Sequence, residues 1–165
     1  MFSAIEISKW FLAKNFAESK TSSIDGEYEG ISPLKMQKLL YYAQGIHLAL
    51  NNAPLFKENI DAWQHGPVVN SVYQEYKNCG SNFITPVFTD KDENLISAIE
   101  NDSTVLESLE LAYNNFAIFT AWQLRNMTHV QGSPWDITTN TTGTGATIDN
   151  NLIKEYFLEN VFEEN

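Results

Sequence analysis

Cysteine is nearly absent from this sequence of 165 residues, in which Cys79 stands alone. A single cysteine excludes an intramolecular disulfide and a metal cluster held by cysteines alone. Such sparse use of cysteine is typical of a reducing compartment, so we expect a cytoplasmic protein. The sequence also lacks a basic segment before its first apolar residues, which argues against a signal peptide. No stretch approaches the roughly 18 apolar residues that a membrane-spanning helix needs.

Basic residues are scarce as well, since 10 lysines and arginines face 21 acidic residues and the formal net charge is −11. Residues 1–60 hold six lysines and six acids, whereas residues 61–165 hold three lysines, one arginine and fifteen acids. An acidic surface repels a phosphate backbone, so we do not expect the protein to bind nucleic acid. The acidity either keeps the protein soluble or attracts a basic partner.

The motifs of common nucleotide-binding and hydrolase sites are missing, because the chain has no GxGxxG, GxxxxGK[ST] or GxSxG. Three histidines, His47, His65 and His129, could converge on a zinc ion, but none lies in an HExxH motif. Cys79 could pair with a histidine as a nucleophile, yet its expected place at a helix C-terminus disfavours the thiolate. We expect no metal, no cofactor and no catalytic residue. The alternative is a small metal- or cysteine-dependent hydrolase.

Hydrophobic residues make up 43% of the chain and aromatic residues 13%, which is typical of a folded globular protein. Ser3 and Glu6 have the spacing of a capping box and predict a helix over about residues 4–19. Further apolar repeats predict helices after Asp90, over 106–116 and 117–127, and after Asp149 at the end of the chain. Residues 20–31 show no period and predict a mobile connection.

Proline stands at the first position of three predicted helices, in the pairs Ser32-Pro33, Gly66-Pro67 and Ser133-Pro134. Proline suits this position because the N–H that it lacks would have no partner in a first helical turn. The sequence therefore predicts a mainly α, compact, multi-helix single domain over residues 1–165. At most a small β-ribbon is expected, in which residues 60–63 pair with residues 83–89.

The predicted helix after Pro33 carries an apolar stripe formed by Met36, Leu39, Leu40, Ala43, Ile46 and Leu50. Gln37, Tyr41 and Gln44 are spaced i, i+4 and i+7 and share a different face, with Lys38 beside it. Because the apolar stripe supplies the burial that the helix needs, we predict that these four residues, together with His65, contact a partner. The alternatives are ordinary solvation or buried hydrogen bonds that hold the fold together.

Several segments together resemble the Panacea domain of SocA-like antitoxins and phage-associated proteins. They are residues 34–45 (LKMQKLLYYAQG), 54–56 (PLF), 62–69 (AWQHGPVV) with Tyr73, 127–129 (MTH) and 133–135 (SPW). The resemblance implies a helical protein that neutralises a cognate protein toxin, commonly encoded in the same operon, by direct contact and without catalysis. An adaptor that delivers the toxin to a protease would look the same in sequence.

Six residues of these segments are expected to serve the fold: Trp63, Gly66, Pro67, His129, Pro134 and Trp135. Large aromatic side chains at such positions are more often core than contact surface. Two positions depart from the pattern of the family. Asn114 replaces the second residue of a Tyr-Gly pair, and Arg125 stands where a small polar residue is common, so both are expected to influence the choice of partner.

Overall fold

The computed structural model describes residues 1–21 and 29–162, and within them the chain forms eight α-helices and one ribbon of two short strands. The helices are α1 (Ala4–Thr21), α2 (Pro33–Asn51), α3 (Asn70–Tyr76), α4 (Asp90–Glu100), α5 (Ser103–Phe116), α6 (Ala121–Thr128), α7 (Pro134–Thr141) and α8 (Asn150–Asn160). The strands are β1 (Asp61–Trp63) and β2 (Gly66–Val68), and a 3-10 turn, η1 (Lys77–Cys79), follows α3. The prediction of a mainly α fold with a small ribbon is confirmed.

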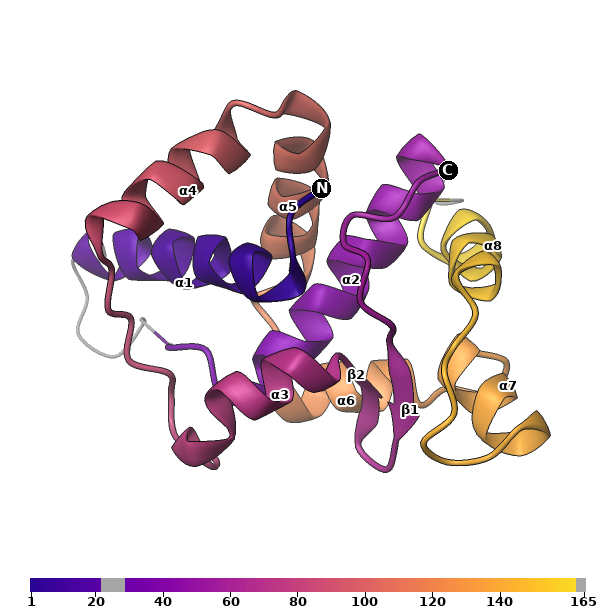
Figure 1. Cartoon of the computed structure of the whole chain (residues 1–165). Helices are drawn as coiled ribbons and strands as arrows, with labels where there is room; N and C mark the ends of the chain where they lie inside the picture. Colours follow the sequence, from indigo (N-terminus) through magenta and orange to yellow (C-terminus); the bar gives the residue numbers. More distant parts are fainter. Residues whose placement is uncertain (22–28, 163–165) are drawn as a thin grey trace.

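Helix α2 is the axis of the molecule (Figure 1), and every residue from Lys35 to Leu48 on it is buried. Helices α5 and α8 pack against it from different sides, while α6 and β2 cover its N-terminal half. A helix that is covered on all sides belongs to the interior rather than to an amphipathic surface layer. Five residues of the predicted apolar stripe are thus only part of the buried surface of this helix, and the sixth, Leu50 at its C-terminal end, is 44% exposed.

Gly45 lets α8 approach α2 closely. A side chain at this position would overlap the ring of Phe157, which lies on α8 and is fully buried. The same ring meets Tyr41 at 5.5 Å and Tyr42 at 5.7 Å between centroids. This aromatic cluster joins α8, near the end of the chain, to the central helix.

The predicted helix starts are set by local hydrogen bonds. Glu6 N–H donates to Ser3 Oγ at 3.1 Å, and Ser3 N–H donates to Glu6 Oε1 at 2.9 Å, which completes the capping box before α1. Ser32 Oγ accepts from the backbone of Lys35, and Ser133 Oγ likewise caps α7, in each case with proline as the first helical residue. These helix starts confirm what the local sequence predicts.

The third proline junction behaves differently, because Gly66-Pro67 begins strand β2 and helix α3 starts only at Asn70. The predicted pairing of the ribbon is also wrong. Strand β1 pairs antiparallel with β2, Ala62 facing Pro67, and no strand is assigned in residues 83–89. Closing a two-residue hairpin loop costs less chain entropy than closing a loop of about twenty residues, which favours the local partner.

The other edge of β1 is covered by the segment that leads into α8. Ala62 N–H donates to Ala146 O at 2.8 Å, and Ile148 N–H donates to Ile60 O at 2.8 Å. Part of the connection predicted for residues 20–31, namely 22–28, lies outside the described residues. No helix in the described part of the chain has the length and apolar character to cross a membrane.

Candidate functional site

The predicted contact residues of α2 are buried, with exposed fractions of 5% for Gln37, 0% for Lys38, 2% for Tyr41 and 0% for Gln44. The expectation that they lie on an exposed face is therefore wrong. Periodicity shows which face is most apolar, but the neighbouring elements α5, α6, α8 and β2 enclose the polar faces as well. A direct contact of these side chains with a partner stays a prediction, and it would require the partner to reach residues that the fold now covers.

Two glutamines of α2 hold segments that are distant in sequence. Gln37 Nε2 donates to Val69 O at 3.1 Å, and Gln37 Oε1 accepts from Val69 N–H at 2.8 Å. Gln44 Nε2 donates to Phe56 O at 3.1 Å, while its Oε1 accepts from Leu55 N–H at 2.7 Å. Buried backbone groups outside regular helices need such partners. The geometry of the two glutamines therefore agrees with the alternative interpretation, in which buried hydrogen bonds hold the fold together.

Lys38 lies between α2, the ribbon and α6. Its Nζ donates to Pro67 O at 2.9 Å, and a side chain at Gly66 would come within 2.8 Å of Nζ and 2.9 Å of Thr128 Oγ1. Gly66 has φ of +110°, which glycine adopts readily and other residues do not. Burial, helped by the nearby charge of Arg125, lowers the pKa of Lys38 to about 7.

The ribbon meets helices α6 and α7 through aromatic residues. Trp135 Nε1 donates to Trp63 O at 2.6 Å, and the ring of Trp135 lies 3.8 Å from the ring of His129 between centroids. The two ring nitrogens of His129 approach Arg125 O at 2.7 Å and Gln64 O at 3.1 Å. The six residues that we expect to serve the fold thus meet at one junction, where Gly66 and Pro67 contact Lys38 from the ribbon and the buried Pro134 begins α7.

The histidines and the cysteine have different surroundings in this arrangement. His47 Nδ1 bonds Ser108 Oγ at 2.8 Å between α2 and α5, and burial lowers its pKa, with Asp102 opposing the shift. His65 is exposed at the ribbon turn, and Cys79 ends the turn η1. Within residues 1–21 and 29–162, no three His, Cys, Asp or Glu side chains gather as a metal ion would require.

This junction falls within the segment that is similar to known proteins. The family described as antitoxin SocA-like, Panacea domain, matches residues 36–136. The chain belongs to this family. It is 33% identical over 135 residues to Antitoxin SocA of Caulobacter vibrioides (strain NA1000 / CB15N), an alignment that covers 77% of this chain and 72% of the relative. None of the solved structures compared with the chain matches it.

The Panacea segment also contains a surface group that we name the Trp122 patch and define as Trp122, Arg125 and His65. Sequence reasoning singled out His65 and Arg125 but missed Trp122, and the structure places the half-buried Arg125 between exposed neighbours. The Trp122 side chain is 55% exposed, the Arg125 guanidinium carbon lies 4.6 Å from the centre of its ring, and the His65 ring lies 6.3 Å away. Cation–π geometry of this kind orients an arginine without neutralising its charge. The sequence feature that could have revealed this patch is a tryptophan that stands among polar neighbours on the short helix α6.

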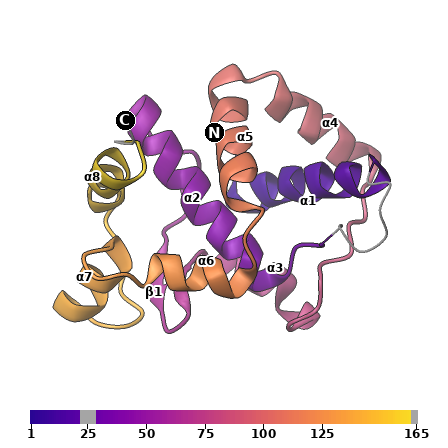
Figure 2. The ribbon, with the colours of Figure 1, turned by 180° about the vertical axis from the view of Figure 1, so that it is seen from behind.

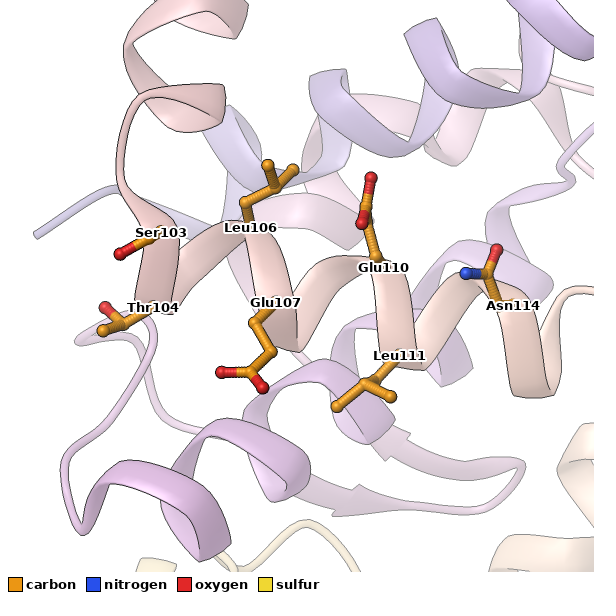
Figure 3. A pocket seen from close by; sticks show the side chains of 7 residues that line it. All are labelled: Ser103, Thr104, Leu106, Glu107, Glu110, Leu111 and Asn114. Atoms are coloured by element: carbon orange, nitrogen blue, oxygen red, sulfur yellow. The ribbon is translucent and has the colours of Figure 1, made fainter.

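A second surface feature of the Panacea segment is an open groove of about 570 Å³ along α5 (Figure 3). Its lining residues all belong to that helix: Ser103, Thr104, Leu106, Glu107, Glu110, Leu111 and Asn114. Asn114, one of the two departures from the family pattern, lies here, whereas Arg125 lies in the Trp122 patch. The two departures therefore occupy different surfaces.

Proposed function

We propose that this member of the SocA-like antitoxin family acts by binding a cognate protein toxin directly and neutralising it, the toxin being encoded in the same operon. The observation that carries the proposal is the family match over residues 36–136, supported by a curated relative named Antitoxin SocA that the chain covers over 72% of its length. We further propose that residues 1–165 form one domain, because α1 and α8 lie outside the family segment yet pack against the same α2.

The polar motif residues support a binding role over a catalytic one. Gln37, Gln44 and Lys38 direct their side chains to backbone groups of the ribbon and of the segment before it. His129 and Trp135 do the same at the junction of the ribbon with α6 and α7. Side chains engaged in this way maintain a rigid surface, and a rigid surface lowers the entropy lost when a protein partner binds.

The proposal is tested by expressing the product of the adjoining gene from an inducible promoter, with and without this chain. We expect growth arrest that this chain relieves, co-purification of the two proteins, and unchanged abundance of the toxin. Relief of the arrest with a fall in toxin abundance that depends on a host protease would favour the adaptor instead. A hydrolase predicts stoichiometric zinc, or an activity that Cys79→Ala abolishes, together with no co-purification.

A further inference from the structure

The arginine of the Trp122 patch is the only one in a chain with a net charge of −11. The single ion pair in the described part of the chain joins Lys9 to Asp92, so no carboxylate of that part pairs with Arg125. Arg125 Nη1 donates to the neutral side chain of Asn126 at 3.2 Å, and Nε is buried without a hydrogen-bond partner. The guanidinium therefore keeps its charge unneutralised and part of its donor capacity unused.

A second basic side chain lies behind this patch. Lys38 is enclosed between α2, β2 and α6 with a carbonyl oxygen, Pro67 O, as its acceptor, and the charge of Arg125 helps to lower its pKa. The two basic groups are thus close enough for the charge of Arg125 to disfavour the protonated form of Lys38. An anion placed at Arg125 would offset this effect.

The composition and exposure of the patch are those of a protein contact. Tryptophan and arginine are the residue types most enriched among side chains that dominate binding energy, and helix α6 lies on the near face of the molecule in Figure 2. Two further exposed apolar residues flank α6 in the sequence, Ile118 at 77% and Val130 at 45% exposure. His129 ties the C-terminal end of α6 to the ribbon turn at Gln64 O, so the patch is held in place before a partner arrives.

We propose that the Trp122 patch is the docking surface for an acidic segment of the protein partner, which places a carboxylate on Arg125 and an apolar side chain against Trp122. The proposal rests on the proposed function, since it names the surface by which the toxin binds. Charge complementarity selects this occupant: a carboxylate accepts from two guanidinium donors at once, which a neutral or basic segment cannot do. The groove on α5, which carries Glu107 and Glu110, is the competing surface and suits a basic segment.

The experiment measures binding of the purified product of the adjoining toxin gene by titration calorimetry, with the full chain as wild type and as the variants Arg125→Glu, Arg125→Lys and Trp122→Ala. We expect at least a 10-fold loss of affinity for Arg125→Glu and for Trp122→Ala, and a smaller loss for Arg125→Lys, with melting temperatures close to that of the wild type. The wild-type affinity should fall with added salt, and Arg125→Glu should reduce that dependence.

Glu107→Gln on the α5 groove is the matched control, an exposed charge change outside the patch, and should leave the affinity unchanged. If every variant of the Trp122 patch bound the toxin with the affinity of the wild type, the proposed docking surface would be wrong, while the proposed antitoxin function would still stand. Loss of affinity in Glu107→Gln alone would also overturn it and assign the contact to α5. Absence of binding and of growth rescue by the wild type would instead overturn the proposed function itself.

Discussion

The side-chain amide of Gln37 pairs with the backbone of Val69 as a peptide group pairs with its neighbour in a β-ladder. Its Nε2 donates to Val69 O at 3.1 Å and its Oε1 accepts from Val69 N–H at 2.8 Å. Val69 is the residue between the end of β2 and the start of α3. One side chain of the central helix therefore satisfies the backbone at the point where the chain changes from strand to helix.

Replacing Gln37 by leucine is expected to lower the free energy of unfolding by about 1–3 kcal/mol, because Val69 N–H loses its acceptor inside the protein, while Val69 O keeps the hydrogen bond from Tyr73 N–H at 3.1 Å. Urea denaturation followed by circular dichroism measures the change. Gln131→Leu is the control, since Gln131 is exposed and such a substitution alters stability by less than about 0.5 kcal/mol. Equal effects of the two substitutions would contradict the structural role of Gln37.

Gly66→Ala should destabilise the protein by more than about 2 kcal/mol, through backbone strain together with overpacking. The added methyl group would approach Lys38 Nζ and Thr128 Oγ1 at 2.8 and 2.9 Å, at a backbone φ of +110°. Gly80→Ala separates the two causes, because Gly80 has φ of +58° and nothing within 4 Å of an added Cβ. That control should cost about 1–3 kcal/mol from strain alone. Thermal melts of both variants give the comparison.

The buried amine of Lys38 predicts a rise in stability with pH. Its pKa is lowered from 10.5 to about 7 in the folded chain, so between these values the unfolded chain binds more protons. The free energy of unfolding should then increase above pH 7, by up to about 1.4 kcal/mol per pH unit for one proton. Urea denaturation at about pH 6.5, 8 and 9.5 measures how the free energy of unfolding changes with pH. These values stay below the ~10 pKa of a tyrosine in the unfolded chain, so tyrosine ionisation does not interfere.

Lys38→Met removes the titrating group while keeping a long apolar stem, and most of the rise between pH 7 and 9.5 should disappear in this variant, the remainder coming from Lys35, whose pKa burial also lowers. Burial raises the pKa values of Tyr41 and Tyr42 in the folded chain. Their ionisation in the unfolded chain therefore lowers stability above about pH 10, and that opposite trend should persist. A wild-type profile that is flat from pH 7 to 9.5 would show that Lys38 remains charged in the fold.

Trp135→Phe is expected to cost about 1 kcal/mol, the usual net value of one hydrogen bond, because it removes the donor to Trp63 O. Trp135→Ala should cost about 3 kcal/mol, near the lower end for a large aromatic residue, since Trp135 is half-buried and packs at the edge of the core. Differential scanning calorimetry measures both. An unchanged melting temperature with lost toxin binding would instead make Trp135 a contact residue.

Much of the fold follows from short-range chemistry and could be predicted. Ser3, Ser32 and Ser133 each satisfy backbone donors within three residues, so the starts of α1, α2 and α7 are encoded where they occur. The first strand of the ribbon was also predicted nearly correctly, since the expected residues 60–63 almost coincide with β1. The strand that pairs with it was not predicted, because Gly-Pro is compatible both with a helix start and with the first residues of an edge strand.

The candidate site shows the opposite case. The sequence of α2 predicts one apolar stripe and a separate polar face. This description is correct for the isolated helix but does not include the elements that pack against it. Whether a polar face meets solvent depends on what packs over it, and the partners of Gln37, Lys38 and Gln44 lie between 11 and 32 residues further along the chain. The exposure of Trp122 beside Arg125 is likewise decided by how α6 is seated against the ribbon.

The sequence by itself determined the helical class, the capped helix starts and the family, because these depend on side chains that act on their own turn or on motifs read in order. Only the tertiary structure decided which polar residues are interior and which surface is left for a partner. The physical reason is that burial of a polar group requires an acceptor or donor from another element. The sequence shows which donors and acceptors are present, whereas only the folded chain shows which of them form hydrogen bonds with one another.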